Sequence, residues 1–381
     1  QLAPARPVPE PAKSPSVCVG PCRQIAAADA EARIAAGDAF VTRCKVPSDG
    51  TTEFDDSIHG HMTFANAELG DFVIARADGS PLYNFANVVD DAAMKITHII
   101  RGNDHLSNTP RQVVLYRVLG HDVPLFAHIP MVLGPDGSKL SKRKHHTSTI
   151  EQLALEGYVP AGVRNAIALI GWNRDDDTTE MSTDEMVAAF DISRVKKSPA
   201  AVDYDKMKHI NALHLRKMTP AEFGAAYEDW RTNWLPADDP LRGAADAVTP
   251  EQAALLVQEK VDLLAGVPPY VEFLLEPFAI NDAAWEKLVA VPDAELVLEH
   301  MIEQLGALDT FSVDSVEAVL RGACEQLERK PRVVFAPVRF AITGRTVSPG
   351  LFESIFVLGK DRALARLADA LARLKAAAVS A

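Results

Sequence analysis

A strand–helix–strand pattern between residues 95 and 133 constrains the fold of this chain more than any other segment. "KITHII" (95–100) is rich in β-branched residues, and "LFAHIPMVL" (125–133) is a continuous apolar run, so both are expected to be buried strands. "SNTPRQVVLYRVLG" (107–120), between them, carries helix signals. Such a unit is most often a right-handed parallel crossover in a sheet covered on both faces. The front of the chain is therefore expected to have an α/β fold.

The helix expected between the two strands has recognisable ends. Asn108 or Thr109 can cap its start, Pro110 suits its first position and Gly120 suits its end. Its apolar face is expected to contain Val114, Leu115, Val118 and Leu119. Because both strands would run the same way, the loops "RGND" and "GPDGSKLSKR" that follow them open on one edge of the sheet. Ligands bind at that edge in open α/β sheets.

The pattern changes on either side of this unit. "HMTFAN" (61–66) is strand-like, and the "ADGS" turn within "DFVIARADGSPLYNFANVV" (71–89) predicts a hairpin. After Thr149, amphipathic helical segments follow one another, and strand signals nearly vanish beyond about residue 215. We therefore expect an all-helical back half behind the α/β front.

Length and charge narrow the possible functions. With 381 residues, the chain is expected to form two or three domains, and no apolar run reaches the roughly 18 residues of a membrane span. The formal net charge of −13 would repel a nucleic acid at long range, so any such contact needs local basic groups. Four scattered cysteines favour a reducing compartment, and we expect a cytoplasmic protein.

The loop "GSKLSKRKHH" (137–146) is the main candidate for chemistry. Lys139 and Lys142 follow a glycine-bearing turn at the ligand edge, so both ammonium groups could reach the oxygens of a triphosphate. The glycine spacing does not match a Walker loop, which argues against a P-loop kinase. The simpler alternative is a solvated surface loop, the usual role of basic runs.

"KLSKR" resembles the K-M-S-K-S signature of class I aminoacyl-tRNA synthetases. Together with "LYNFANVVDD", "RGNDH", "NTPRQ", "SKLSKRKHHTS" and "PVRFAITGRTVSPGLFESIFVLGKDR", it makes the chain similar to bacterial-type glutamyl-tRNA synthetase from about Cys18 to the end. The resemblance implies a partial Rossmann-type catalytic domain with an α+β insertion, followed by an all-α anticodon-binding region. The implied segments are an N-terminal linker with a partial acceptor-end insertion (1–82), the second half of the catalytic domain (83–149), a stem-contact helical domain (150–218) and an anticodon-binding domain (219–381).

The same resemblance implies a glutamate site. Arg101 would bind a carboxylate of L-glutamate, because the planar guanidinium group matches a carboxylate in shape and charge. Tyr83 and Asn87 match the family's substrate-binding tyrosine and asparagine. The alternatives are a surface ion pair for Arg101 and a half-buried strand pair for Tyr83 and Asn87.

The resemblance also implies an ATP site. Lys139 and Lys142 would be the catalytic lysines that face ATP, with Ser141 as an additional donor. Asp104 and His105 match residues that line the pocket for ATP and the tRNA end. Asn103 departs from the acidic residue that is commoner at its position. Mg²⁺ is expected to accompany ATP.

Three other patterns are expected to carry no chemistry. "IHGHM" (58–62) is a permuted form of the histidine signature that cradles ATP, and it lies in a strand-like run. Cys18 and Cys22 could hold half a zinc site, but no convincing second pair follows, so we expect no metal site. His145 and His146 are adjacent and would point about 100° apart on a helix, which does not suit chelation of one metal, so we expect them to be polar surface or tRNA-facing groups.

Basic residues do gather locally despite the acidic total, either as tRNA contacts or as solvated helix faces. One basic group contains Arg194, Lys196, Lys197, Lys206 and Lys208. The second basic group contains Arg329, Lys330, Arg332, Arg339 and Arg345.

The implied function is glutamate–tRNA ligation, in which ATP activates L-glutamate to glutamyl-adenylate before its transfer to the 3′ end of tRNA(Glu). The family's N-terminal histidine signature has no counterpart here, so we expect a fragment of a longer product that activates glutamate poorly by itself. A noncatalytic tRNA-binding module is the alternative. A glutaminyl enzyme is disfavoured, because the back half of that relative is a β-barrel. We expect a monomer; whether tRNA(Gln) is also charged stays open.

Overall fold

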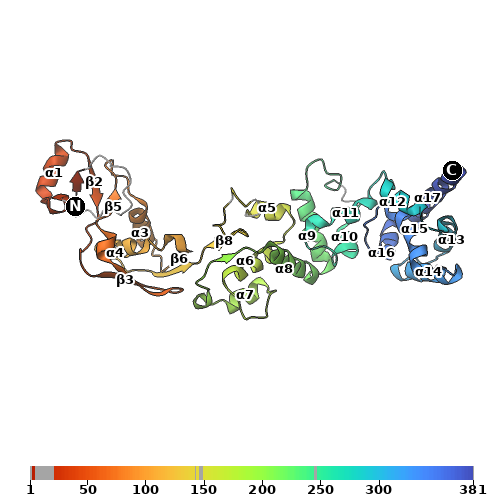
Figure 1. Ribbon diagram of the computed structural model, residues 1–381, viewed down its shortest axis with the longest axis horizontal. Helices are drawn as coiled ribbons and strands as arrows, with labels where there is room; N and C mark the ends of the chain where they lie inside the picture. The colour runs from red at the N-terminus through yellow and green to blue at the C-terminus, as the bar shows by residue number, and fades with distance from the viewer. Residues whose placement is uncertain (1, 5–20, 142, 146–148, 244–246, 381) are drawn as a thin grey trace. The chain divides into compact units, whose positions relative to one another are not determined.

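The computed structural model describes residues 2–4, 21–141, 143–145, 149–243 and 247–380 and divides the chain into two compact units (Figure 1). The first unit consists of Gln1–Leu140, Ile167–Thr178 and Asp184–Val202. The second unit consists of Ser141–Ala166, Thr179–Thr183 and Asp203–Ala381.

A four-stranded sheet forms the centre of the first unit. Its strands lie in the order β4 (Gly60–Ala65), β3 (Thr51–Asp56), β7 (Leu125–Ile129) and β6 (His98–Gly102). β3 and β4 form an antiparallel hairpin, whereas β7 runs parallel to both β3 and β6. The register places Arg101 opposite His128. Side chains from two neighbouring strands therefore meet near the carboxyl edge of the sheet.

The predicted crossover from β6 through α4 (Thr109–Leu119) to β7 is confirmed as parallel. Pro110 lies in the first turn of α4, and Gly120 ends the helix in the left-handed region with φ +75°. The predicted apolar face was partly wrong. Val114 and Leu115 are buried where α4 packs on α3 (Tyr83–Ala93) and β3, but Val118 and Leu119 are exposed.

The predicted hairpin around "ADGS" was wrong in its second arm. The turn itself forms, since the Arg76 N–H donates to the Ser80 carbonyl and Ala75 pairs with Pro81. However, only Val73–Ala75 is a strand (β5), and Tyr83–Ala93 is the helix α3. Apolar residues at positions 85, 88, 89 and 92 have helical spacing, which outweighs the strand-like composition. Tyr83 and Asn87 therefore lie on a helix and not on a strand.

The run at 125–133 is divided at Pro130, so the single strand expected there was also wrong. β7 ends at Ile129, and β8 (Val132–Leu133) pairs in parallel with β9 (Ala200–Ala201) in a separate sheet. Proline has no N–H to donate to a ladder, which favours a break at this position.

The first unit also contains a third sheet and several short helices. β1 (Leu2–Pro4), β2 (Phe40–Arg43) and β5 form an antiparallel sheet. The short helices are η1 (Pro21–Gln24), α1 (Ala27–Ala35), α2 (Asn66–Leu69), η2 (Asn103–His105), α7 (Thr183–Ala189) and η4 (Ile192–Arg194). α6 (Pro160–Gly171) begins in the second unit and ends in the first.

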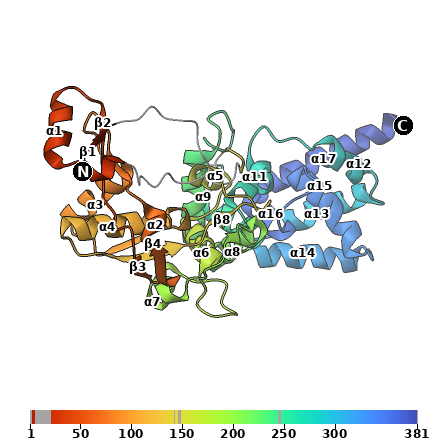
Figure 2. The same cartoon turned by 60° about the vertical axis from the view of Figure 1, so that its left-hand side comes forward.

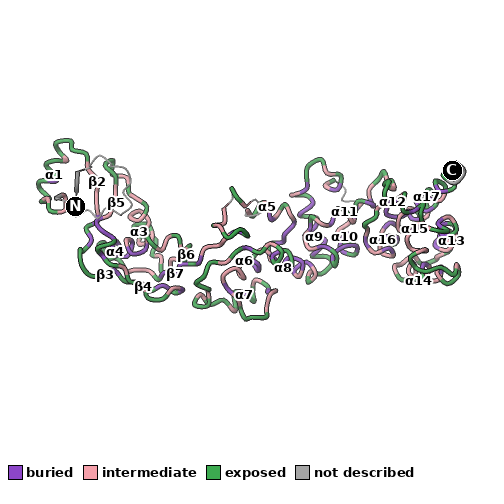
Figure 3. Tube along the Cα trace, in the orientation of Figure 1, coloured by how far each residue is buried: buried purple, intermediate pink, exposed green. Residues whose placement is uncertain are grey.

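The second unit is helical, as the sequence predicts. Its elements besides α6 are α5 (Ile150–Leu155), α8 (Tyr204–Lys217), α9 (Pro220–Trp234), α10 (Pro250–Val257), η5 (Leu264–Gly266), α11 (Pro268–Val271), η6 (Glu272–Leu274), α12 (Asp282–Val289), α13 (Ala294–Gly306), α14 (Val313–Gln326), α15 (Pro331–Thr343), α16 (Leu351–Leu358) and α17 (Lys360–Ser380). α13, α15 and α17 pack against one another (Figure 2), and buried stretches recur along α8, α9 and α10 (Figure 3). Among the helices that the structure describes, none combines the length and apolar character that crossing a bilayer requires.

Gly157, which follows α5, offers a test of the packing in the second unit. Its φ is +85°, and an added Cβ would lie 2.5 Å from the Ala265 nitrogen and 2.6 Å from the Leu264 nitrogen. Gly120 also follows a helix with positive φ, but nothing lies within 4 Å of its added Cβ. We expect Gly120→Ala to cost about 1–2 kcal/mol of stability from conformation alone. Gly157→Ala should cost more, because backbone atoms of η5 must also move. Calorimetric unfolding of both variants checks this order, and equal losses would contradict it.

Candidate active site

Arg101 lies on β6 and is held by neutral acceptors. Its Nε donates to His128 Nε2 at 3.2 Å, and its Nη2 donates to Thr109 Oγ1 at 2.8 Å and to Gln112 Oε1 at 2.6 Å. In the described part of the chain, no carboxylate lies within 4.0 Å of its guanidinium nitrogens. Burial lowers the pKa of Arg101, although the group stays a cation. These hydrogen bonds therefore fix the orientation of the guanidinium group, and none of the described carboxylates forms an ion pair with it.

Gln112 on α4 joins Arg101 to α3. The Gln112 side chain is buried; its Oε1 accepts from Arg101, and its Nε2 donates to Asn87 Oδ1 at 2.9 Å and to Asn84 Oδ1 at 3.3 Å. Two residues predicted to bind glutamate, Arg101 and Asn87, are thus brought together through one amide. No role for Gln112 was predicted from the sequence, although it belongs to the "NTPRQ" motif.

Tyr83 and His105 meet at the same edge of the sheet. Tyr83 begins α3 and is 52% exposed, and its hydroxyl lies 3.4 Å from His105 Nδ1. The two ring centroids are 5.8 Å apart. His105 ends η2, the turn that follows β6. The tyrosine predicted to bind glutamate therefore adjoins a residue predicted to line the ATP site.

Lys139 reaches the loop that follows β6. The Gly134 N–H donates to the Ser138 carbonyl, Gly137 has φ +74°, and Lys139 pairs with Leu133 across this turn. Lys139 Nζ then lies 2.9 Å from Asp104 Oδ2, and both side chains are exposed. This hydrogen bond lowers the pKa of Asp104. The two loops expected at one edge of the sheet do meet there.

The rest of the basic loop is only partly described. The Ser141 N–H donates to His145 Nδ1 at 3.1 Å, and Ser141 belongs to the second unit. Lys142, the second predicted lysine, and His146 lie outside the described residues.

A buried aspartate–histidine pair lies beneath Arg101, and the sequence analysis missed it. Asp56 ends β3, and its Oδ2 lies 2.6 Å from His128 Nδ1 on β7. Its Oδ1 accepts from the backbone N–H groups of Ile58 and His59, each at 2.9 Å. Both side chains of the pair have 0% exposure. A single histidine within the apolar run "LFAHIPMVL" was the signal that could have found it.

The pair consists of a charged carboxylate and a neutral imidazole. Burial by itself would raise the pKa of Asp56, but hydrogen bonds from His59, His128 and Ile58 outweigh it, so the pKa is lowered. Burial lowers the pKa of His128, and the nearby Arg101 and His59 lower it further, against the hydrogen bond to Asp56. Because its pKa is lowered, the imidazole stays neutral and can accept the hydrogen bond from Arg101.

Two of the sequence patterns that were expected to carry no chemistry lie within or partly within the described residues. In "IHGHM", His59 Nε2 lies 3.1 Å from the His128 carbonyl oxygen, and His61 on β4 pairs with Asp55. Cys22 is half-buried, and Cys18 lies outside the described residues. In the part of the chain that the structure describes, no cluster of three histidine, cysteine or acidic residues could hold a metal.

The two basic groups differ in exposure. Every member of the first basic group is exposed, and Arg194, Lys196 and Lys197 belong to the first unit, whereas Lys206 and Lys208 belong to the second. In the second basic group, Arg339 is half-buried and donates to Ser348 Oγ at 2.8 Å and to the Pro349 carbonyl at 2.9 Å. Burial lowers the pKa of Arg339. The more exposed residues are the better candidates for phosphate contacts.

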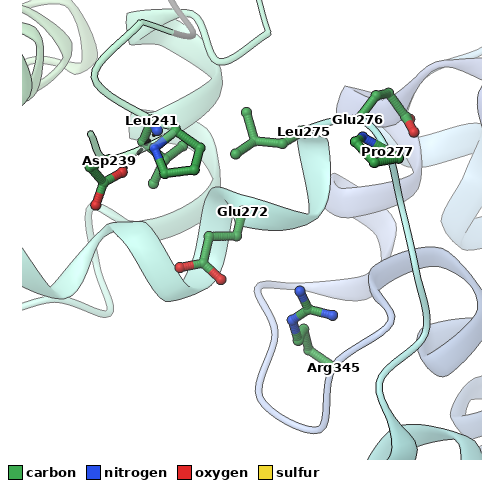
Figure 4. A pocket seen from close by; sticks show the side chains of 8 residues that line it. Asp239, Leu241, Glu272, Leu275, Glu276, Pro277 and Arg345 are labelled. Carbon is green, nitrogen blue, oxygen red and sulfur yellow. Dashed lines mark hydrogen bonds between the residues drawn. The ribbon is translucent and has the colours of Figure 1, made fainter. Parts of the chain in front are cut away.

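A hollow of about 320 Å³ lies in the second unit (Figure 4). Glu272 on η6 and Arg345 in the loop after α15 extend from different elements around it. Its walls are formed by Asp239, Pro240, Leu241, Glu272, Leu275, Glu276, Pro277 and Arg345. None of these residues is predicted to bind glutamate or ATP.

Both the N-terminal and the C-terminal part of the chain are similar to known protein families. The catalytic-domain model of class I tRNA synthetases (E and Q) matches residues 9–209, and an anticodon-binding-domain model matches residues 226–371. Glutamate–tRNA ligase 2 of Rubrobacter xylanophilus is 36% identical over 364 residues, which cover 93% of this chain and 72% of that protein. Glutamate–tRNA ligase of Frankia casuarinae is 39% identical over 343 residues, covering 90% and 72%.

A solved structure agrees with these relatives. The glutamate tRNA ligase of Elizabethkingia meningosepticum, solved in complex with its amino acid, superposes with a TM-score of 0.77 at 25% identity. The match covers 92% of this chain and 72% of that one. The resemblance and the fold class predicted from the sequence are both confirmed. The chain belongs to the glutamate–tRNA ligase family of class I tRNA synthetases.

Proposed function

We propose that this chain joins L-glutamate to the 3′ end of tRNA(Glu) at the expense of ATP. The observation that carries the proposal is the Gln112 bridge, which links Arg101 to Asn87 near the carboxyl end of β6. In the first step, the α-carboxylate of glutamate attacks the α-phosphate of ATP, giving glutamyl-adenylate and pyrophosphate. In the second, a terminal ribose hydroxyl of tRNA takes the glutamyl group and releases AMP. Positioning and charge stabilisation suffice for both steps, so no protein nucleophile is required.

Arg101 would hold a carboxylate of glutamate. Its Nε and Nη2 already donate to side chains of β7 and α4, so we assign Nη1 to the substrate. If the substrate carboxylate bound both Nη1 and Nη2, Arg101 would first have to break its hydrogen bond to Thr109 or to Gln112. Partial burial strengthens the attraction between the guanidinium and a carboxylate. Tyr83 and Asn87 lie four residues apart on α3 and share a face, from which they would orient the amino acid.

Lys139 would stabilise the charge that develops on the phosphates of ATP, with Lys142 as a second cation and Ser141 as a donor. Asp104 holds Lys139 at the ligand edge, and this exposed ion pair is weak enough to exchange for phosphate. His105 would line the same pocket. Mg²⁺ would arrive with ATP as part of the substrate, because it keeps most of its water and needs few protein ligands. We propose no zinc.

Transfer requires contact with tRNA. We propose that the insertion within residues 1–82 contacts the acceptor end, that 83–149 completes the catalytic domain, that 150–218 contacts the stem and that 219–381 reads the anticodon. The exposure of the first basic group supports phosphate contacts, which can form locally on an acidic protein. Unstacked anticodon bases would be read by side chains of the helical region. We propose a cytoplasmic monomer.

An aminoacylation assay tests the reaction. The protein expressed from its own gene is mixed with ATP, Mg²⁺, labelled glutamate and tRNA(Glu), and we expect label on the tRNA only when ATP is present. Parallel reactions with tRNA(Gln) decide whether that tRNA is charged too. Binding of tRNA(Glu) without any ATP-dependent product would instead favour the noncatalytic tRNA-binding module.

A further inference from the structure

We propose that Asp56 and His128 form a positioning relay that aims Arg101 at the substrate by fixing which nitrogen of His128 carries the proton. The inference rests on the proposed role of Arg101 in binding glutamate. Neither residue is expected to touch the substrate. Both act through Arg101, so they are positioning residues for this reaction.

The direction of the relay follows from the chemistry of its members. A guanidinium can only donate hydrogen bonds, so His128 Nε2 must accept from Arg101 Nε at 3.2 Å. A neutral imidazole then carries its proton on Nδ1, which donates to Asp56 Oδ2 at 2.6 Å. The ionised carboxylate can only accept, so it stabilises this tautomer and no other.

The relay is anchored at its far end. Backbone N–H groups of Ile58 and His59 donate to Asp56 Oδ1, and the backbone N–H of His128 lies 3.1 Å from Asp56 Oδ2. These contacts fix the carboxylate in the turn after β3. Hydrogen bonds therefore run from that turn through β7 to Arg101 on β6. Both members of the pair are fully buried, so water cannot substitute for either partner.

Thr109 completes the support of the arginine. Its Oγ1 accepts from Arg101 Nη2 at 2.8 Å, lies 2.9 Å from His128 Nε2 and donates to the His105 carbonyl at 3.3 Å. If His128 carried its proton on Nε2, that N–H would face the N–H of Arg101 Nε, and only the Thr109 oxygen could accept from it. The arginine would then lose an acceptor and meet another donor at the same point. The wrong tautomer should therefore displace Arg101.

Asp56→Asn tests the relay with almost no change in shape. An amide cannot accept from every donor that surrounds the carboxylate, so its NH₂ either faces His128 Nδ1 or opposes the backbone N–H groups. We expect His128 to shift its proton to Nε2 and the KM for glutamate to rise roughly tenfold, because a buried donor is left unpaired. The KM for ATP should change little. Asp55→Asn is the matched control, since Asp55 is the preceding residue, lies exposed and pairs with His61.

Two measurements decide the outcome: ¹⁵N NMR of histidine-labelled protein, which distinguishes the two tautomers, and aminoacylation kinetics. A wild-type spectrum with the proton of His128 on Nε2 overturns the inference without any variant, so the test survives if Asp56→Asn folds poorly. It is also overturned if Asp56→Asn changes the tautomer and leaves the KM for glutamate unchanged while Arg101→Ala raises it. If Arg101→Ala also leaves that KM unchanged, the proposed glutamate site fails, and the relay fails with it. A purely structural role would lower stability without a selective change in the KM for glutamate.

Discussion

Replacing Arg101 with alanine is expected to raise the KM for glutamate roughly 10- to 150-fold. The variant removes a charge-assisted hydrogen bond of about 1.5–3 kcal/mol, and each 1.4 kcal/mol corresponds to about a tenfold change. It also leaves the buried Oε1 of Gln112 without its Arg101 donor, whereas the bond that Lys139 makes is to Asp104. The KM for ATP should therefore change much less. Steady-state aminoacylation with glutamate and ATP varied separately measures both constants.

Arg117→Ala is the matched control for this experiment. Arg117 lies exposed on α4 and donates to the Glu53 carbonyl at 2.8 Å, away from the predicted substrate residues. Arg101→Lys is a second comparison, because lysine keeps the charge but cannot serve His128, Thr109 and Gln112 with the same planar geometry. An unchanged KM for glutamate in Arg101→Ala would contradict the proposed site.

Competition by glutamine shows which carboxylate Arg101 holds. Glutamine shares the α-carboxylate of glutamate but has a neutral amide in its side chain. If Arg101 holds the side-chain carboxylate, Arg101→Ala should weaken glutamate binding and leave inhibition by glutamine nearly unchanged. If it holds the α-carboxylate, both should weaken together.

The parts of the fold that depend on local signals could be predicted from the sequence. The apolar strands β6 and β7, the proline in the first turn of α4 and the glycine after it are properties of short segments. Connection rules then gave the parallel pairing and the edge at which Asp104 meets Lys139. The prediction of a hairpin at 71–89 was wrong because two local signals competed. The turn predicted at "ADGS" does form, but the helical spacing of apolar residues makes the segment that follows a helix.

The arrangement beneath Arg101 could not be predicted in the same way. Asp56 and His128 are 72 residues apart, and their contact depends on the pairing of β3 with β7. Arg101 meets His128 only because the register of β6 and β7 places them opposite each other. Sequence patterns suggest that strands exist, but they rarely specify which residues face each other across them. The resemblance pointed to Arg101, whereas the structure was needed to find what holds it.

Replacing Lys139 with alanine is expected to lower kcat for glutamylation of tRNA about a hundredfold, because comparable losses follow removal of one preorganised donor to developing charge. The KM for ATP should change less, since the contact matters most as the phosphates gain charge in the transition state. Single-turnover measurement of adenylate formation isolates this step. Lys45→Ala is the control, because Lys45 is exposed and, among the described residues, donates a single long hydrogen bond of 3.4 Å to the Arg23 carbonyl.

Asp104→Asn separates the phosphate role of Lys139 from its ion pair. The pair is exposed, so its loss should cost at most about 1 kcal/mol, and ATP can still attract the lysine once Asp104 is neutral. We therefore expect a small effect from Asp104→Asn and a large one from Lys139→Ala. Equal effects would mean that the ion pair itself shapes the loop. A normal rate in Lys139→Ala would mean that "GSKLSKRKHH" is a solvated loop and that the phosphates are stabilised elsewhere, because a lysine that contacts developing charge cannot be removed without slowing the step.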